Sequence, residues 1–402
     1  MNKILQTFLL GIITALFFSA FIYFEEYDLT NRLLNTFFGL SALTLFLYIP
    51  KRSILIAGFF IGLFWFYWIG YSFEYQEVGY MSPIITLAFG FIYLLFFLPL
   101  YFTNKPYIRA ILLFGLSFIE PFNWNWLQIE LLFVDSYLGV YKYQLFLILA
   151  SLALPSFFKK VPYKFLPLLL LFGAINYGYP PQENTPLKIK LVQTEIPQEY
   201  KWTKKAFYPT IKMVFQEIDK AKKEHYDLIV LPESVLPLYL NKNPILLQKL
   251  QKESMYISLL LGTLLQENHK SYNVSYLFEN GNYTIAKKLV LVPFGEYIPL
   301  PKFAQKFINE TFFSGASDFL AASHPTDFTI KGIKFRNAIC YEATCQELYE
   351  GDVKYMLAIS NNAWFAPSIE PTLQKLLLRY YARKNGVTIY HSANYKGSGI
   401  IK

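Results

Sequence analysis

The uneven distribution of apolar residues along the chain constrains its fold more than any other feature. Long apolar runs dominate from Met1 to about Tyr179, whereas the sequence from about Pro186 onward resembles an ordinary soluble α/β protein. Only 16% of the residues are charged, against about 25% in a typical soluble domain. We therefore predict a transmembrane helical domain at residues 1–179, a linker at 180–186 and a soluble domain at 187–402, which is long enough for its own core.

Seven apolar runs in the first part predict about seven membrane-spanning helices. A helix that crosses a bilayer needs about 20 mostly apolar residues, and some of these runs are shorter than that. The fifth run is extended by Trp-rich sequence toward Phe133. The runs are Ile4–Phe24, Leu33–Tyr48, Ile54–Tyr71, Pro83–Tyr101, Ala110–Ile119, Tyr143–Phe157 and Phe165–Tyr177.

The charges between these runs predict how the chain is oriented. Lys and Arg cluster in alternate loops, such as Lys51-Arg52 and Lys159-Lys160, while acidic groups such as Glu25-Glu26 fall mostly in the others. Lys and Arg mark the cytoplasmic side of a membrane. Seven spans that start inside place the soluble domain in the periplasm or outside the cell. The net charge of +9 does not indicate nucleic-acid binding, because the lysines are spread along the chain.

The soluble part alternates between strand and helix patterns. Two hairpins are expected, one turning at Asn280-Gly281 and one at Lys331-Gly332, because these residue pairs favour tight turns between strands. Helical apolar spacing is found in 204–225, and helices are also expected at 244–255 and 372–384. A buried-type strand is expected at 227–231, and further strands at 257–265, 355–359 and 387–392. This order predicts a sheet covered by helices.

Three chemically active side chains follow predicted strands. Glu233 comes after the strand that stops at Leu231, Lys288 closes the first hairpin, and Cys340 closes the second. Each also has a structural interpretation: a helix N-terminal acid, a surface lysine and a small buried hydrophobe. Ligands of open α/β sheets bind beyond the carboxyl ends of strands. If these ends converge, a carboxylate, an ammonium and a thiol share one pocket.

Such a trio suits nucleophilic catalysis by the thiol. A thiol at its ordinary pKa is mostly protonated at neutral pH and needs a base, which Glu233 can supply. Lys288 and a backbone N–H near Tyr341 can stabilise the oxyanion of a tetrahedral intermediate. The product is a thioester on Cys340 that a second nucleophile resolves. The four histidines are scattered without metal-ligand spacing, so we predict neither a Cys-His dyad nor a metal site.

Around these residues the sequence resembles the nitrilase superfamily, whose catalytic trio is Glu, Lys and Cys. More closely, it is similar to the apolipoprotein N-acyltransferase family. The resemblance spans nearly the whole soluble part and implies an α-β-β-α sandwich behind a multi-span helical membrane domain. The matching stretches are Val192–Trp202, Leu231–Ser234, Lys288–Tyr297, Ile339–Glu342 and Ile359–Phe365.

The resemblance implies a role for several residues. Glu233 would be the general base, Lys288 the oxyanion stabiliser and Cys340 the nucleophile. The residues that bind substrate or assist would be Glu296 beside Lys288, Tyr341 and Glu342 next to the thiol, and Trp202 on a mobile arm over the entrance. The apolar loop around Trp364 either lines an apolar entrance or is ordinary loop packing.

It also implies the reaction and the partners. Cys340 takes an acyl chain from a phospholipid, typically phosphatidylethanolamine, and the α-amine of an S-diacylglyceryl-cysteine on an apolipoprotein then attacks the thioester. An acyl-enzyme that waits for an amine must exclude water. No cofactor is implied, and the expected location is the bacterial inner membrane, with the catalytic domain facing the periplasm.

The sequence departs from the family pattern at three places. Val290 stands where members usually have His, and Asn362 stands where they often have Asp. We expect both changes to tune the activity without abolishing it. Members also usually end with a further transmembrane helix, whereas this sequence stops at Lys402; either the lineage lacks that helix or the chain is truncated.

Two other functions and one complication follow from the same residues. A membrane-tethered amidase or nitrilase would use the same trio with water as the acceptor, and a membrane scaffold or transporter would keep the soluble domain without catalysis. Cys345 lies five residues after Cys340, and outside the cytoplasm the pair can oxidise to a disulfide. We predict that both thiols are reduced and that Cys345 is buried at the start of a helix.

Overall fold

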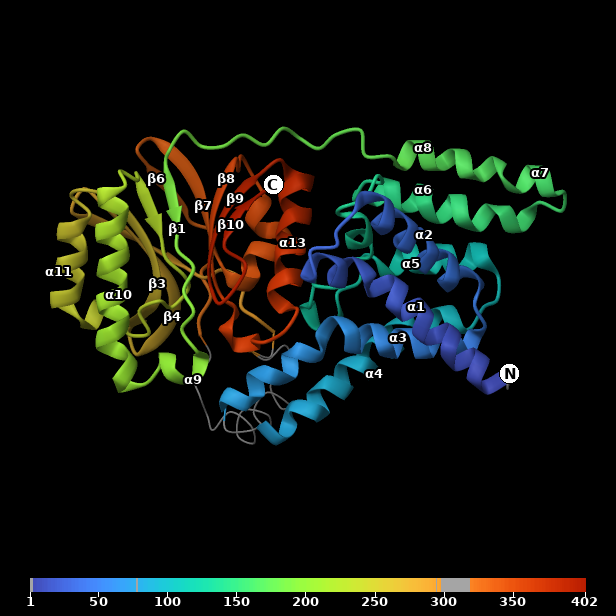
Figure 1. Ribbon diagram of the computed structural model, residues 1–402, viewed down its shortest axis with the longest axis horizontal. Coiled ribbons are helices and arrows are strands. Elements are labelled where there is room, and N and C mark those ends of the chain that lie inside the picture. Colours follow the sequence, from blue (N-terminus) through green and yellow to red (C-terminus); the bar gives the residue numbers. More distant parts are fainter. Residues whose placement is uncertain (1–2, 77–78, 294, 298–318) are drawn as a thin grey trace. The chain divides into compact units, whose positions relative to one another are not determined.

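The computed structural model describes residues 3–76, 79–293, 295–297 and 319–402. The chain forms two compact units (Figure 1). The first consists of Met1–Tyr179 and Ser368–Tyr380, and the second of Pro180–Pro367 and Tyr381–Lys402. Helix α13 (Glu370–Asn385) thus contributes residues to both units, a division that the sequence pattern does not reveal.

The first unit is helical, as predicted. Three of its described helical stretches are long and apolar enough to cross a membrane: Lys3–Glu26, Lys51–Tyr75 and Gly79–Tyr101. Four shorter apolar stretches follow the remaining predicted runs, at Arg32–Tyr48, Pro106–Leu116, Lys142–Phe157 and Val161–Ala174. The number of crossings stays a prediction. The α-helices are α1 (Lys3–Glu26), α2 (Arg32–Tyr48), α3 (Lys51–Phe66), α4 (Ser82–Tyr101), α5 (Pro106–Leu116), α6 (Lys142–Ala153), α7 (Val161–Lys164) and α8 (Leu170–Ala174).

The expected extension of the fifth run toward Phe133 is wrong as a continuous helix. Helix α5 ends at Leu116, and the Trp-rich sequence after it holds only the short 3-10 turns η3 (Pro121–Asn123) and η4 (Ile129–Phe133). Pro121 cannot continue a helix because its ring clashes with the preceding turn. Phe122 follows with a φ of 55°, which lies in the left-handed region.

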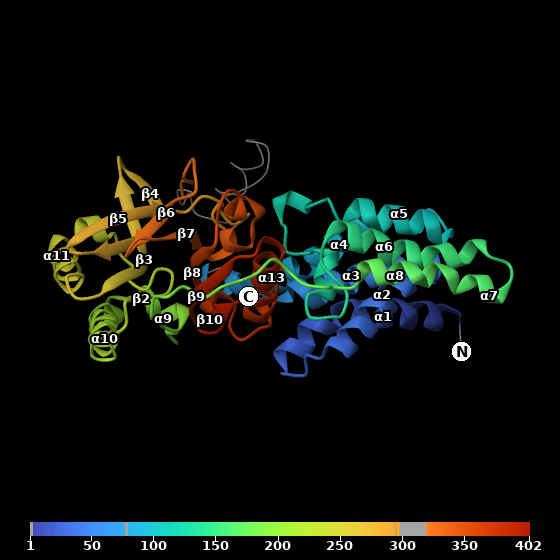
Figure 2. The same ribbon diagram turned by 90° about the horizontal axis from the view of Figure 1, so that it is seen from above.

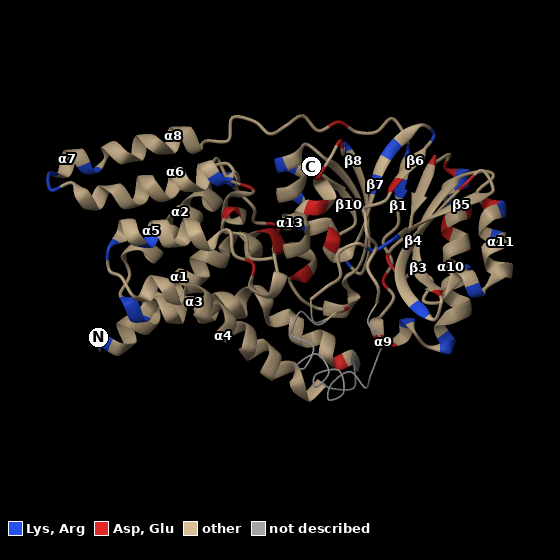
Figure 3. Ribbon diagram, turned by 180° about the vertical axis from the view of Figure 1, so that it is seen from behind, with Lys and Arg blue, Asp and Glu red and all other residues tan. Residues whose placement is uncertain are grey.

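Charged residues are sparse on the helices of the first unit. Figure 3 shows most of its Lys and Arg at one end and most of its Asp and Glu at the other. Lys142 is an exception, because its ammonium forms an ion pair of 2.5 Å with the buried Glu130. This separation of basic from acidic residues agrees with the alternation of loop charges along the sequence.

In its described residues, the second unit contains two five-stranded sheets, where the sequence pattern alone indicated one. The first has the order β1-β2-β3-β4-β5 and the second the order β10-β9-β8-β7-β6. The strands of the first sheet are β1 (Ile189–Leu191), β2 (Leu228–Val230), β3 (Ser258–Glu267), β4 (Lys270–Glu279) and β5 (Asn282–Lys287). Those of the second are β6 (Asp327–Ile330), β7 (Ile333–Ile339), β8 (Tyr355–Asn361), β9 (Thr388–Asn394) and β10 (Gly399–Ile401).

Alternating side chains explain how the two sheets pack. In β2, Leu228 and Val230 belong to a core shared with the second sheet, which includes Phe335 and Leu357. Ile229 points to the opposite face, into a core with residues of α10 (Lys204–Lys223) and α11 (Pro244–Glu253). Figures 1 and 2 show these two helices on the outer side of the first sheet. The predicted sandwich fold is confirmed.

Both predicted hairpin turns are present. Asn280 and Gly281 have φ values of 50° and 78°, and Lys331 and Gly332 have values of 47° and 80°. Two successive positive φ angles are typical of a type I′ turn, which matches the twist of the strands that it joins. The turns set the registers of β4–β5 and β6–β7, and these registers place Lys288 and Cys340 just beyond the ends of β5 and β7.

Candidate active site

Glu233 lies in the turn after β2, with 7% of its surface exposed. Its Oε1 accepts a hydrogen bond of 2.7 Å from the side-chain amide of Asn273 in β4. The turn presses against β3 at Gly262, where a Cβ atom would lie 2.6 Å from Cα of Glu233 and 2.5 Å from N of Ser234. Only glycine leaves room for the backbone of this turn at its present place.

Lys288 is 1% exposed and directly follows β5. Its Nζ lies 2.7 Å from Oε2 of Glu296. Burial alone disfavours the ammonium, but the negative charges of Glu296 and Glu233 outweigh it and raise the pKa of Lys288. Lys288 therefore remains a cation at neutral pH, and a fixed cation at this place can stabilise a developing negative charge.

Cys340 is half-buried at the junction between β7 and the 3-10 helix η8 (Cys340–Thr344). Its φ is 58°, a left-handed conformation that costs a non-glycine residue on the order of 1–3 kcal/mol. Strained backbone of this kind is enriched at active sites. The sharp turn takes the chain from the strand into the short helix at the residue that carries the thiol.

Hydrogen bonds and charges bring these residues together. The amide of Asn273 that binds Glu233 also lies 3.3 Å from Oε1 of Glu296, so one side chain contacts both carboxylates. Lys288 interacts electrostatically with Glu296, Glu233 and Cys340. The three strand ends singled out in the sequence therefore converge on one site, with Glu296 as its second carboxylate.

Glu342 connects the two loops that carry Lys288 and Cys340. Its Oε2 accepts hydrogen bonds from the backbone N–H groups of Leu289 and Val290, at 2.6 and 3.1 Å, and its Oε1 accepts one from Ile339 at 2.7 Å. Burial raises the pKa of Glu342 to about 7, against the opposing effects of Lys288 and the three N–H groups. Glu342 thus holds the Lys288 loop against the end of β7.

The other predicted site residues have different surroundings. Tyr341 is 3% exposed, beside the thiol. Trp202 is 46% exposed at the end of the short helix α9 (Gln198–Lys201), and Trp364 is half-buried in the 3-10 helix η10 (Asn362–Phe365). Phe294, in the stretch Lys288–Tyr297, lies outside the described residues. The functional roles of all these residues remain predictions.

Sequence reasoning missed three residues of this site. Asn273 binds both carboxylates, Gly262 makes room for the Glu233 turn, and Lys201 donates a hydrogen bond to the backbone carbonyl of Glu233 at 3.0 Å. Asn273 and Gly262 lie inside strands, where the pattern indicates only burial. The neighbouring Trp202, which was a predicted site residue, could have indicated Lys201. However, a lysine in a polar stretch is usually interpreted as a surface residue.

Cys340 and Cys345 are thiols in the structure and are not joined by a disulfide. Cys345 is 4% exposed and directly precedes the 3-10 helix η9 (Gln346–Tyr349), as predicted. Its Sγ lies 3.6 Å from the carbonyl oxygen of Tyr341. The second thiol is therefore packed inside the fold.

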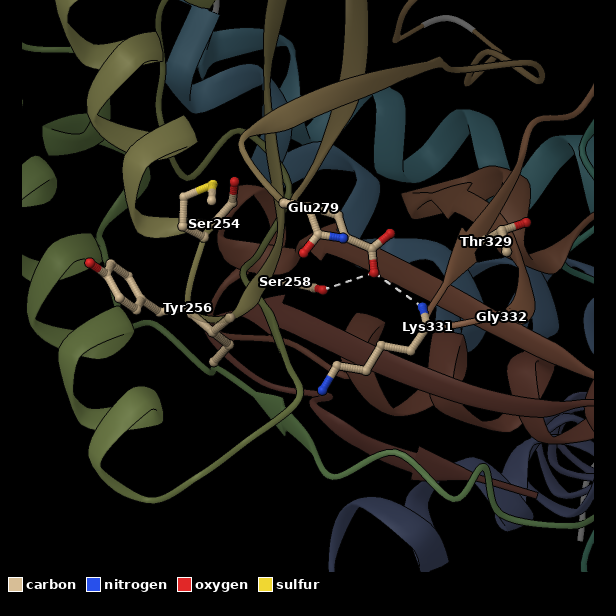
Figure 4. Close-up of a pocket in the computed structure, with 10 residues that line it drawn as sticks. Ser254, Tyr256, Ser258, Glu279, Thr329, Lys331 and Gly332 are labelled. Carbon is tan, nitrogen blue, oxygen red and sulfur yellow. Dashed lines mark hydrogen bonds between the residues drawn. The ribbon is translucent and has the colours of Figure 1, made fainter.

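A cavity of about 440 Å³ lies elsewhere in the second unit (Figure 4). Its lining includes Ser258 at the start of β3, and Lys331 and Gly332 in the turn before β7. In Figure 4, Glu279 accepts hydrogen bonds from Ser258 and from the backbone of Lys331. Since β2 and β3 are parallel, this cavity is at the opposite strand ends from Glu233 and Cys340, and it holds none of the predicted site residues.

Metal binding finds no support in the described part of the chain. Among residues 3–76, 79–293, 295–297 and 319–402, no group of three or more His, Cys, Asp or Glu side chains is arranged to hold an ion. That the protein needs no metal remains a prediction.

Comparison with known proteins identifies the family. Residues 5–177 match the apolipoprotein N-acyltransferase integral membrane domain, and residues 188–397 match the carbon-nitrogen hydrolase family. The apolipoprotein N-acyltransferase of Wolinella succinogenes is 44% identical over 96% of this chain and 94% of its own length. That of Helicobacter pylori is 39% identical over 89% and 84%, and that of Helicobacter hepaticus 36% over 94% and 96%. The chain belongs to the apolipoprotein N-acyltransferase family, as the sequence resemblance predicted.

Proposed function

We infer that this membrane enzyme transfers an acyl chain from a phospholipid to the amino group of an S-diacylglyceryl-cysteine at the N-terminus of apolipoproteins. The observation that carries the mechanism is the convergence of Glu233, Lys288 and Cys340 at three strand ends, with Glu296 2.7 Å from Lys288. These groups supply a base, a cation and a nucleophile at one place. A thioester on Cys340 connects the two halves of the reaction.

In the first half, Glu233 takes the proton of the Cys340 thiol and the thiolate attacks the ester carbonyl of the phospholipid. The negative charge that develops on the carbonyl oxygen is stabilised by the ammonium of Lys288. When the C–O bond breaks, the lysophospholipid alkoxide receives the proton from Glu233. The acyl chain is left on sulfur, and Glu233 is again a carboxylate.

In the second half, the α-amine of the apolipoprotein attacks the thioester carbonyl. Lys288 again faces the oxyanion, while Glu233 accepts the proton that the amine loses. Collapse of the intermediate breaks the C–S bond, and the thiolate of Cys340 recovers a proton from Glu233. The products are an N-acylated lipoprotein and the starting enzyme.

Glu296, Glu342 and Asn273 keep these groups in position. Glu296 fixes the ammonium of Lys288 by their ion pair, and Glu342 fixes the backbone after Lys288. The aromatic side chains of Trp202 and Trp364 contribute to the path of the acyl chain, and the exposed surface of Trp202 suits contact with lipid. Phosphatidylethanolamine is the proposed donor.

The apolar helices place the enzyme in a membrane, and we assign it to the bacterial inner membrane with the catalytic unit in the periplasm. The Lys and Arg residues of alternate loops support this orientation, because such residues remain on the cytoplasmic side. Both substrates are anchored in the same bilayer, so the reaction needs a membrane-bound catalyst.

The experiment that tests the function supplies both substrates together. The purified protein is incubated with phosphatidylethanolamine and a synthetic S-diacylglyceryl peptide, and the products are separated by mass spectrometry. We expect N-acyl peptide and lysophospholipid in equal amounts. Free fatty acid without N-acyl peptide would instead identify a membrane-tethered amidase-like hydrolase that uses water. Unchanged activity of both Cys340→Ala and Cys340→Ser would exclude Cys340 as the nucleophile.

A further inference from the structure

Lys201 is a buried lysine next to an exposed tryptophan. It is the last residue of α9, and only 1% of its surface is exposed, compared with 46% for Trp202. Lysine side chains are rarely buried to this extent unless the ammonium is paired. The lysine side chain points into the fold, toward the turn that carries Glu233.

The ammonium of Lys201 contacts two polar groups. Nζ of Lys201 donates to the backbone carbonyl of Glu233 at 3.0 Å. It also lies 3.2 Å from a terminal atom of the Asn361 amide, and Nε1 of Trp364 lies 3.2 Å from the same atom. In the orientation of the Asn361 amide that these two donors favour, this atom is the amide oxygen, and Oε1 of Gln198 also lies 2.9 Å from it. Lys201 therefore links α9 to the Glu233 turn and to the carboxyl end of β8.

Neither of these partner atoms carries a charge. Lys201 differs in this from Lys288, whose partner is a carboxylate. Burial lowers the pKa of Lys201 to about 8, and the charges of Glu233 and Cys340 oppose this effect without cancelling it. Lys288 has the carboxylate of Glu296 at 2.7 Å and keeps its proton. The site thus contains one permanent ammonium and one that titrates near neutral pH.

We propose that Lys201 is a positioning residue of the acyl-transfer site, which fixes the Glu233 turn and whose positive charge favours the thiolate of Cys340. The proposal rests on the proposed function, because it concerns the same thiol. A mere packing role would need the hydrogen bonds of Lys201 but not its charge. The ammonium of Lys201 lies 3.0 Å from the backbone carbonyl of Glu233, where its charge acts on both Glu233 and Cys340, and this position is the reason to assign it more than packing.

Charge accounting explains the effect. Before and after proton transfer, Glu233 and Cys340 share one negative charge, and Glu296 carries a second. The ammonium groups of Lys288 and Lys201 balance these two charges. When Lys201 is neutral, the site has an excess negative charge, which Glu342 increases once it ionises near pH 7. An excess negative charge raises the pKa of the thiol. No bond to Lys201 is made or broken in this account.

A pH dependence follows from the titration of Lys201. The charged groups that act on its ammonium are Glu233 and Cys340, while Asn361 and Trp364 contribute neutral atoms. As the pH rises through about 8, the ammonium is lost and acylation of the enzyme slows. The acceptor amine titrates in a similar range, so the acylation half-reaction with phospholipid alone is the one to measure.

The test compares Lys201→Met and Lys201→Arg with a control, Lys204→Met, which changes an exposed lysine three residues away. Two quantities are followed from pH 6 to 10: the rate at which iodoacetamide alkylates Cys340, located by peptide mass spectrometry, and the rate of acylation by phosphatidylethanolamine. Alkylation reports the thiolate directly and does not require acyl transfer. A failure of the proposed function therefore leaves the test of Lys201 intact.

We expect Lys201→Met to raise the pKa of Cys340 by about one unit, which makes alkylation at neutral pH about tenfold slower. Its acylation rate should fall by a similar factor and no longer decline near pH 8. Lys201→Arg should recover much of the rate and move the alkaline decline to higher pH, while Lys204→Met should match the wild type.

An alkylation profile of Lys201→Met that coincides with the wild type would overturn the proposal. If Lys201→Met does not fold, the pH dependence of the wild-type acylation rate tests the proposal by itself. An acylation rate that declines near pH 8 supports the proposal, and a rate that stays level from pH 7 to 10 contradicts it.

Discussion

The side-chain amide of Asn273 donates a hydrogen bond of 2.7 Å to Oε1 of Glu233. The same amide lies 3.3 Å from Glu296, so it connects the proposed base to the carboxylate that holds Lys288. Asn273 is 5% exposed, which makes its hydrogen bonds to charged groups stronger than those on a protein surface. The orientation of the proposed base and of the carboxylate that holds Lys288 therefore depends on one neutral side chain.

Replacing Asn273 tests this dependence. Asn273→Ala removes a hydrogen bond to a charged group, worth about 1.5–3 kcal/mol, and we expect acylation to slow by roughly ten- to a hundredfold. Asn273→Asp should be worse, because it adds a third carboxylate beside Glu233 and Glu296. Thioester formation is measured by intact-protein mass spectrometry. Asn282→Ala, at the exposed start of β5, is the control and should behave as the wild type.

The close approach at Gly262 gives a second prediction. Gly262→Ala forces a Cβ to within 2.6 Å of the Glu233 backbone, so the turn must shift, at a cost of about 1–3 kcal/mol. We expect a lower melting temperature in detergent and a loss of acylation. Gly115→Ala has no heavy atom within 4 Å of its new Cβ and should leave both properties unchanged. Full activity of Gly262→Ala would show that the position of the turn is not critical.

The buried side chain of His391 in β9 should make the free energy of unfolding depend on pH. Its Nδ1 donates to the carbonyl of Gly397 and its Nε2 accepts from Ser360 Oγ, both at 2.8 Å. Burial lowers the pKa of His391 to about 4, from 6.5 in the unfolded chain. Between these values the unfolded chain binds more protons, so this contribution to stability is complete above pH 6.5 and is lost as the pH falls toward 4.

The variant His391→Asn keeps a donor for Gly397 and removes the titrating ring. We expect its melting temperature to be lower than that of the wild type at pH 7 and to fall less between pH 6.5 and 5. Thermal unfolding in detergent across this range measures both quantities. Parallel curves for the two proteins would contradict the assignment of the acid sensitivity to His391.

The buried side chain of Glu342 should make stability depend on pH in the opposite direction. Its folded pKa is about 7, above the 4.5 of the unfolded chain, so the folded state binds more protons between these values and its stability falls as the pH rises through them. Glu342→Gln removes this slope. It also replaces one of two accepting oxygens by a donor that faces a backbone N–H, so we expect slower acylation at every pH. A variant with wild-type acylation would show that Glu342 does not position Lys288.

The sequence was sufficient for the parts of the fold that local patterns encode. Apolar runs and alternating strands predicted the two regions, and Asn280-Gly281 and Lys331-Gly332 predicted both hairpins. Residues of the trio were identified because each follows a strand. The second sheet was not visible in the pattern, since buried strands of either sheet look alike, and only the family resemblance implied it.

Residues that act through long-range contacts could not be predicted in this way. Asn273 meets Glu233 only because β4 lies beside β3 in the sheet, and Lys201 meets it only because α9 folds back onto the end of β2. Neither residue type is unusual at its place in the sequence. The left-handed conformation of Cys340 is also a property of the folded turn.

The central claim is that Cys340 carries the acyl chain, and the most direct measurement is the mass of the enzyme after exposure to phosphatidylethanolamine alone. The account predicts one added acyl group, located on Cys340 by peptide analysis, removed by hydroxylamine and transferred when the diacylglyceryl peptide is added. Cys340→Ala should gain no mass. Formation of N-acyl peptide without any acyl-enzyme, or with the acyl group on another residue, would contradict the account.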